Sequence, residues 1–255
     1  MLVWSALIKC NTWARCCTSS TYVAFGPFTK VRHAGRMRNR IGALIGLFAQ
    51  VVFVVSWIVA PVWQGPRYSV LAHSISDMYA VTAPAGLFLV VVFTVCGAVT
   101  IAFLWTAVCP ALRAAGWSAT LGVILLSVSI FGLGDLLSPF ERLACRLADP
   151  GCADASQLSN AGGAIDSSLS TIGVGLFVAG AVFIAVAALK LPAWKRAFAP
   201  LLILAIATFV FFVADGLLAS VGLAGLFERL LALSGAATFA WLAVDILRRS
   251  PRTAA

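Results

Sequence analysis

Residues 63–80, WQGPRYSVLAHSISDMYA, hold the greatest variety of reactive side chains in an otherwise apolar chain. The side chains that could form a site there are Arg67, Tyr68, His73, Ser76 and Asp77. A histidine and a carboxylate close together can act as general base and general acid. Alternatively, Ser74, Ser76 or Asp77 caps the next helix by accepting hydrogen bonds from its first amides, where a carboxylate also suits the helix dipole. The sequence leaves both interpretations open.

Two aspartates interrupt apolar runs, Asp135 in GLGDLL and Asp215 in VADGLL. A charged side chain at the centre of a bilayer costs about 2.5–3.5 kcal/mol on insertion scales, so such groups usually face the bundle interior and find a partner. Asp135 shares a helical face with Ser127 and Ser138, which would give that helix an inward polar stripe. The partners that we expect are arginines on the same side, namely Arg67, Arg142 and Arg229. Salt bridges between helix ends are one interpretation, and a proton relay or ligand site is the other.

Two parts of the chain contain a similar short sequence, which we call the FERL echo. The sequences DLLSPFERL at 135–143 and LFERL at 226–230 share the pairs Glu141-Arg142 and Glu228-Arg229. Internal repeats occur in many transporters. One short match does not establish a repeat here.

Cys145 and Cys152 lie in the longest expected loop, on either side of an Asp-Pro-Gly turn signal. The charge pattern described below places this loop on the outer face, where the compartment is oxidising and disulfides persist. We therefore expect these two cysteines to form a disulfide. Closing so short a loop contributes about 2–3 kcal/mol to stability in the chain-entropy model.

The sequence contains no recognisable metal or cofactor motif. Cys10, Cys16 and Cys17 lack the paired CxxC spacing of zinc sites, and His33 and His73 are the only histidines. No HExxH, Walker, GxGxxG or GxSxG pattern is present. The sequence therefore predicts no metal and no cofactor, and it disfavours an enzyme.

The composition is that of an integral membrane protein. Of 255 residues, 62% are hydrophobic and only 11% are charged, whereas soluble domains carry about 25% charged residues. This excludes a soluble enzyme, a disordered chain and a small disulfide-stapled secreted protein. The net charge of +9 comes from short basic clusters between apolar runs, a pattern typical of membrane topology rather than of a nucleic-acid-binding face. The expected partner is the lipid bilayer and not a nucleic acid.

The elements that must position these side chains are membrane-spanning helices, each of which needs about 20 mostly apolar residues. Six runs qualify, at residues 41–62, 82–108, 118–138, 167–189, 199–221 and 225–247. With this arrangement, 14 of the 18 Lys and Arg residues fall on one side. The positive-inside rule places that side and both termini in the cytoplasm. The predicted fold class is an all-α, polytopic, six-helix bundle in the cell membrane.

The chain divides into a basic N-terminal tail over residues 1–40, a transmembrane domain over 41–248 and a short basic C-terminal tail over 249–255. Met37 opens a basic cluster directly before the first span, so it is an alternative start of the protein. Asp245 precedes Arg248 and Arg249 by one helical turn, and we expect a local ion pair there.

Three stretches, YSVLAHSISDMYA, APAGLF and GLFERL, resemble a family of bacterial polytopic membrane proteins catalogued as domain of unknown function 998. The resemblance covers roughly residues 40–248 and leaves residues 1–36 outside. It implies a multi-helix membrane fold without implying a reaction. Members often carry a histidine near the start of the fourth helix, whereas this chain reads SNAGGAIDSSLST there. A role built on that histidine is therefore not carried over.

Three classes of function follow. The favoured one is a non-enzymatic membrane factor that binds a lipid or small molecule at its outer face. A small proton-coupled carrier using Asp135 and Asp215 comes second, because the sequence shows neither charged residues deep at mid-membrane nor a clear broken helix of the kind that carriers use. An outer-face membrane enzyme using His73 and Asp77 comes third, because neither a nucleophile nor metal spacing accompanies them.

Overall fold

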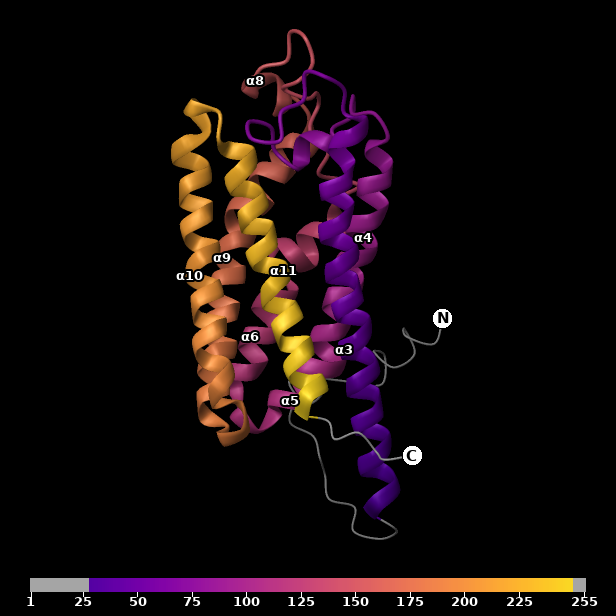
Figure 1. Ribbon diagram of the computed structural model, residues 1–255, viewed down its shortest axis with the longest axis vertical. Coiled ribbons are helices and arrows are strands. Elements are labelled where there is room, and N and C mark those ends of the chain that lie inside the picture. The colour runs from indigo at the N-terminus through magenta and orange to yellow at the C-terminus, as the bar shows by residue number, and fades with distance from the viewer. Residues whose placement is uncertain (1–27, 250–255) are drawn as a thin grey trace.

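Residues 28–249 are described by a computed structural model, and within this range the chain forms helices and no strands (Figure 1). Five of the helices are long and apolar enough to cross a membrane. The predicted all-α, multi-pass fold is therefore confirmed. Cys10, Cys16, Cys17 and most of the expected C-terminal tail lie outside the described residues.

The long helices agree with five of the predicted spans. They are α3 (Phe28–Val59), α4 (Gly86–Phe103), α9 (Ala161–Lys190), α10 (Phe198–Leu218) and α11 (Ala224–Arg249). The helix α3 begins at Phe28, well before residue 41, although its apolar span starts only at Met37. Short helical turns extend or connect the long helices, namely η1 (Ala60–Trp63), η2 (Ser76–Tyr79), η3 (Leu104–Val108), α5 (Cys109–Leu112), η4 (Arg113–Ala115), α8 (Asp154–Gln157), η6 (Pro192–Ala197) and η7 (Ala219–Val221).

The remaining predicted span is not a continuous helix. It consists of α6 (Trp117–Ser127), then η5 (Ile130–Gly134) and α7 (Asp135–Leu137), and the two parts meet at an angle of 44°. Ser129 adopts an extended backbone at the break, and its hydroxyl donates to the carbonyl of Leu126. The expectation of unbroken helices is therefore wrong here. The span was predicted from its apolar length alone. The residues around the break are apolar enough that hydropathy does not reveal it.

The break also removes the predicted polar stripe. Ser127 and Asp135 lie on opposite sides of the bend, so an eight-residue helical spacing no longer places them on one face. The hydroxyl of Ser127 donates to the carbonyl of Val123, and that of Ser138 to the carbonyl of Asp135. Both hydroxyls thus bond to backbone carbonyl oxygens, and neither bonds to the carboxyl group of Asp135.

Glycines let the broken helix approach its neighbours closely. A methyl group on Gly97 of α4 would lie 2.5 Å from the amide nitrogen of Leu136 and 2.7 Å from the carbonyl oxygen of Gly132. One on Gly173 of α9 would lie 2.8 Å from the amide nitrogen of Ile130. Small residues at such crossings permit backbone contact between membrane helices. The break is therefore clamped between α4 and α9.

The centre of the bundle is filled by aromatic rings. Phe131, at the break, has its ring centroid 4.9 Å from that of Phe177, 6.2 Å from that of Phe53 and 6.3 Å from that of Phe239. A further contact links Phe53 to Phe93 of α4. Edge-on and tilted pairs of this kind are favourable beyond the area that they bury. We call Phe53, Phe93, Phe131, Phe177 and Phe239 the aromatic core.

The two ends of the bundle differ in structure (Figure 1), and they also differ in charge. One end carries α8 and the long connections at 64–85 and 138–160, and we call it the capped end. The opposite end carries α5, η6 and the end of α11, and we call it the basic end. Its described cations beyond α3 are Arg113, Lys190, Lys195, Arg196, Arg248 and Arg249. This separation agrees with the charge pattern of the sequence.

We predict that Gly97→Ala lowers stability by about 1–3 kcal/mol, because the added methyl group meets backbone atoms that cannot move aside cheaply. The measurement is the thermal unfolding of the purified protein in detergent. Gly175→Ala in α9 is the matched control, since its methyl group meets nothing within 4 Å. Alanine is also the better helix former, so the control should be neutral or slightly stabilising. Equal melting temperatures for the two variants would contradict the close approach of α4 to the break.

Candidate functional site

The connection between η1 and α4, residues 64–85, folds over the capped end and contains the predicted polar stretch; we call it the cap loop. Its middle part is deeply buried, with Asp77 and Met78 at 0% exposure. Buried backbone groups in an irregular segment need hydrogen-bond partners from elsewhere in the protein. The side chains around the cap loop supply them.

Arg229 of α11 binds the cap loop from below. Its Nη1 donates to the carbonyl oxygens of Val70, His73 and Gly225 at 2.7–2.9 Å. Its Nη2 donates to the hydroxyl of Tyr68, which in turn donates to the carbonyl of Ser74. Burial raises the pKa of Tyr68, and the Arg229 guanidinium partly opposes that shift. The structure thus brings two predicted site residues together, as a clamp on the loop backbone.

Arg142 binds the next part of the same loop. Its Nε and Nη2 donate to the carbonyl oxygens of Tyr79 and Ala80, both at 2.9 Å. Glu228, which precedes Arg229 in the sequence, also binds the loop backbone, because its Oε2 accepts a hydrogen bond from the amide of Ile75. Both Glu-Arg sequences of the FERL echo therefore supply groups that bind cap-loop backbone. Neither arginine forms a salt bridge with Asp135 or Asp215.

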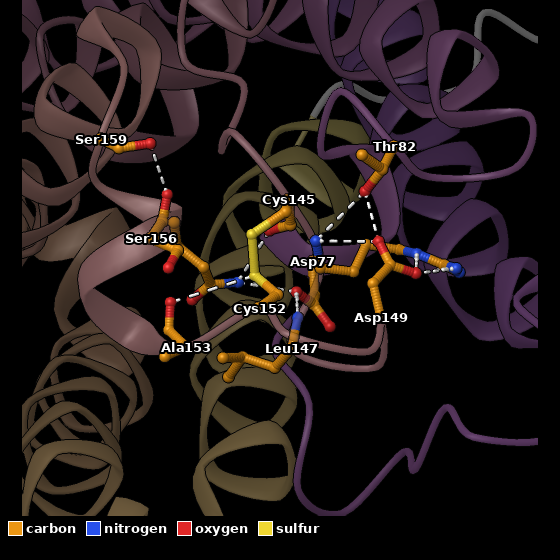
Figure 2. Close-up of a disulfide and its surroundings, with 11 residues drawn as sticks. Asp77, Thr82, Cys145, Leu147, Asp149, Cys152, Ala153, Ser156 and Ser159 are labelled. Atoms are coloured by element: carbon orange, nitrogen blue, oxygen red, sulfur yellow. Dashed lines mark hydrogen bonds and ion pairs between the residues drawn. A yellow bond between two sulfur atoms is a disulfide. The ribbon is translucent and has the colours of Figure 1, made fainter.

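Asp77 ties the cap loop to the second long connection (Figure 2). Its Oδ1 accepts hydrogen bonds from the amide of Leu147 and from Nε2 of Gln157, each at 2.8 Å. Burial raises the pKa of Asp77, and the bond from Leu147 partly opposes the shift. The other carboxylate oxygen, Oδ2, is buried without a hydrogen-bond partner.

The predicted cap on the following helix is wrong in its location. The helix α4 starts at Gly86, nine residues beyond Asp77, with Ala85 before it in a left-handed conformation and no side-chain cap. Instead, the hydroxyl of Ser74 accepts from the amide of Asp77 and starts the short turn η2. Ser76 bonds to Ser74 through their hydroxyls.

His73 and Arg67 do not complete a catalytic arrangement. Nδ1 of His73 accepts a hydrogen bond from the amide of Ser69, and its ring packs on Tyr68. Within residues 28–249, no hydrogen bond joins His73 to Asp77. The side chain of Arg67 is exposed.

Cys145 and Cys152 form a disulfide, the pairing expected from the loop sequence (Figure 2). Beside it, the Arg146 guanidinium pairs with Asp149, which also accepts a hydrogen bond from Thr82 of the cap loop. Burial opposes ionisation of Asp149, but these hydrogen bonds outweigh it and lower the pKa. Arg146 also donates to the carbonyl of Gln64 at 2.9 Å, so the disulfide-closed loop is bonded to the cap loop.

The salt bridges expected for Asp135 and Asp215 are absent from the described part of the chain. The ion pairs found there are Arg146–Asp149 and Arg249–Asp245, and the second of these confirms the local pair predicted near the end of α11. Neither Asp135 nor Asp215 forms a side-chain hydrogen bond with another described residue. The arginines that the sequence assigned to them are used by the cap loop, or are exposed as in the case of Arg67.

Several carboxyl groups instead lie near Tyr79 of the cap loop. The Tyr79 hydroxyl donates to Oδ1 of Asp166 in α9 at 3.3 Å. Burial raises the pKa of Tyr79 strongly, and four nearby carboxyl groups raise it further. We call these groups the acidic cluster, and they are Asp166, Glu141, Glu228 and Asp135.

Glu141 is the most buried member of the acidic cluster. It is 5% exposed, and its Oε1 is buried and has no hydrogen-bond partner among the described residues. Burial, together with the negative charge of Asp166, raises the pKa of Glu141 to about 8. A buried carboxyl without a cation keeps its proton near neutral pH, or else binds a positively charged ligand.

Sequence reasoning found one of the four carboxyl groups of this cluster as a site residue. Asp135 stood out because it interrupts an apolar run, whereas Glu141, Asp166 and Glu228 follow or precede expected loops and resemble solvated residues. The available signal was the concentration of acids on one side of the bundle together with the repeated FERL sequence. Among the described residues, no group of three or more His, Cys, Asp or Glu side chains is arranged to hold a metal ion.

No protein-family model matches this chain, and no curated protein or solved structure is significantly similar to it. The resemblance to domain of unknown function 998 stays a prediction from the quoted motifs.

We predict that Arg229→Lys lowers stability by about 1–3 kcal/mol, although it conserves the charge. A lysine ammonium cannot reproduce the planar set of donors that Arg229 offers to three carbonyl oxygens, so at least one buried acceptor loses its partner. Arg67→Lys is the control, because that side chain is exposed at the same end. Thermal unfolding in detergent measures the effect. A melting temperature for Arg229→Lys equal to that of the control would show that the clamp is dispensable.

We predict that reduction makes the thiols of Cys145 and Cys152 available for alkylation, measured as a mass shift of the peptides that carry them. The double variant Cys145→Ser/Cys152→Ser should lose about 2–3 kcal/mol of stability, because the unfolded chain regains the entropy of a short closed loop. Alkylation of both cysteines before reduction would refute the disulfide.

Proposed function

We propose that this protein is a small proton-coupled carrier for an organic cation, with the acidic cluster as its proton- and cation-binding site. The proposal rests on one observation, that among the described residues no cation is paired with the carboxyl groups of the acidic cluster. Asp135, Glu141, Asp166 and Glu228 all lie near Tyr79, where Glu141 is buried and the other three are half-buried, and none of them forms a salt bridge with a described residue. Protons or a cationic ligand must therefore balance them.

Competition between protons and a cation would give the coupling. When the carboxyl groups are protonated, the site is neutral and a cation gains little by entering. When protons leave, the same oxygens attract the cation, and the aromatic face of Tyr79 offers a further favourable contact. The described donor groups are not arranged to hold a metal ion, so we propose an organic cation as the ligand.

The broken helix supports a carrier over a purely structural protein. Discontinuous membrane helices line the substrate sites of many carriers, and here the break lies one turn before Asp135. Phe131 in the break packs into the aromatic core, which separates the acidic cluster from the basic end. The sequence pattern offers two arguments against a carrier, the lack of a clear broken helix and the lack of charged residues deep in the membrane, and the bend at 44° weakens the first.

The other two functions receive less support. The enzyme hypothesis needs His73 and Asp77 as free acid and base groups, but Nδ1 of His73 and Oδ1 of Asp77 accept hydrogen bonds that hold the cap loop in place. A non-enzymatic lipid-associated factor needs no buried acids. We further propose, from the positive-inside rule, that the protein lies in the cell membrane with its basic end and both termini in the cytoplasm.

We predict that Glu141→Gln reduces the pH dependence of stability. Burial raises the pKa of the Glu141 carboxyl to about 8 in the native state, whereas the ordinary pKa of a glutamate is 4.5. Between these values the native state binds more protons than the unfolded state, so stability falls as pH rises through this window and levels off above it. The glutamine variant lacks this contribution, and its melting temperature should fall less over the same range. Asp154→Asn is the control, because Asp154 is exposed on α8 and should leave the pH profile unchanged. A Glu141→Gln profile identical to wild type would contradict the raised pKa.

We predict that cation uptake releases protons. Proteoliposomes of the full chain, with tetraphenylphosphonium as the test cation, should acidify the outer solution as the cation enters, and an outwardly directed proton gradient should accelerate uptake. Glu141→Gln should abolish the proton release, and Asp154→Asn should retain it. Uptake by wild type that ignores the proton gradient, or proton release that persists in Glu141→Gln, would refute the proposed coupling.

A further inference from the structure

A groove opens at the basic end, between the turn η6, the start of α10 and the last turns of α11. Its volume is about 680 Å³. Its charged lining consists of Arg196, Arg248, Arg249 and Asp245, and Pro192, Pro200 and Trp241 form its apolar walls. We call it the basic groove.

The cations of the basic groove outnumber its acids. Three guanidinium groups face one carboxylate, and that carboxylate is already bonded to Nη2 of Arg249 at 2.6 Å. The side chains of Arg196 and Arg248 are exposed. Within the described residues, neither of them forms a salt bridge or a side-chain hydrogen bond. The groove therefore holds two uncompensated positive charges.

Arg249 is fixed in place between two neighbours. Its guanidinium lies over the ring of Trp194, 4.5 Å from the centroid, while Asp245 holds one of its nitrogens. The Nε of Arg249 is nevertheless buried and has no hydrogen-bond partner within residues 28–249. A pre-positioned donor that lacks an acceptor, beside two free guanidinium groups, is suited to an oxyanion.

We propose that the basic groove binds the headgroup phosphate of an anionic phospholipid. Arginine matches phosphate oxygens with paired donors, and basic pockets between membrane helices commonly hold acidic headgroups. Trp241 is 38% exposed at the groove, where an amphipathic ring suits the level of the headgroups. The adjoining surface of α10 is apolar and exposed, so the acyl chains can lie against it.

The basic groove and the acidic cluster lie at opposite ends of the bundle. No residue is shared between them, and the lipid site does not rest on the proposed transport function. Its test therefore gives an answer whether or not the protein carries a cation.

The experiment measures lipid binding to the full chain by native mass spectrometry from detergent, with phosphatidylglycerol and phosphatidylcholine of the same acyl chains. Phosphatidylglycerol should bind more tightly than phosphatidylcholine. The double variant Arg196→Gln/Arg248→Gln should weaken phosphatidylglycerol binding roughly 30-fold, since each lost guanidinium removes direct hydrogen bonds to the phosphate, worth a factor of about five per residue. The matched control is Lys195→Gln/Arg113→Gln, which removes the same charge from exposed residues of the same end that do not line the groove. The control should bind nearly as tightly as wild type.

Three results would overturn the proposal. Equal losses in the double variant and its control would show that general surface charge attracts the lipid. Equal binding of the two lipids would show that the headgroup charge is not recognised. Inorganic phosphate forms the third arm, followed as a rise in melting temperature that depends on Arg196 and Arg248. Such a rise without any preference for phosphatidylglycerol would assign the groove to free phosphate instead of lipid.

Discussion

The structure of the capped end depends on one requirement, that buried backbone groups of an irregular segment be hydrogen-bonded at the edge of a membrane. The cap loop meets it with long cationic side chains brought from distant parts of the chain. Arg142, Arg146 and Arg229 all donate to cap-loop carbonyl oxygens. Each guanidinium carries several donors in a fixed plane, so one residue can satisfy two or three acceptors at once.

The same use of arginine explains the acidic cluster. Arg142 and Arg229 donate to backbone carbonyl oxygens, so among the described residues no cation forms a salt bridge with the four carboxyl groups of the acidic cluster. The close packing of Gly97 of α4 and Gly173 of α9 against the broken helix fixes the break in the third span next to this cluster. The polar region thus depends on two features together. Glycine packing places the break beside the carboxyl groups, and the cap loop takes the arginines that could have paired with them.

The sequence predicted the features that depend on average hydropathy and local spacing. The helical spans and the Asp245–Arg249 pair are of this kind, because apolar length and a separation of one helical turn determine them. The break at Ser129 was missed because its sequence, SVSIFGLG, is as apolar as a continuous span. Glu141 and Glu228 were missed for another reason. Their burial comes from the cap loop folding above them, and that depends on contacts between residues more than 60 positions apart.

The contacts between Arg229 and the cap loop have a consequence for biosynthesis. The residues that they join are separated by 156–161 positions along the chain. At translation rates of about 5–20 residues per second, the loop would wait on the order of ten seconds or more before its partner is made. During that interval its carbonyl groups must be solvated by water at the membrane surface. The contacts from Arg142 and Arg146 to the same loop can form earlier, and the arrival of α11 then adds those from Arg229.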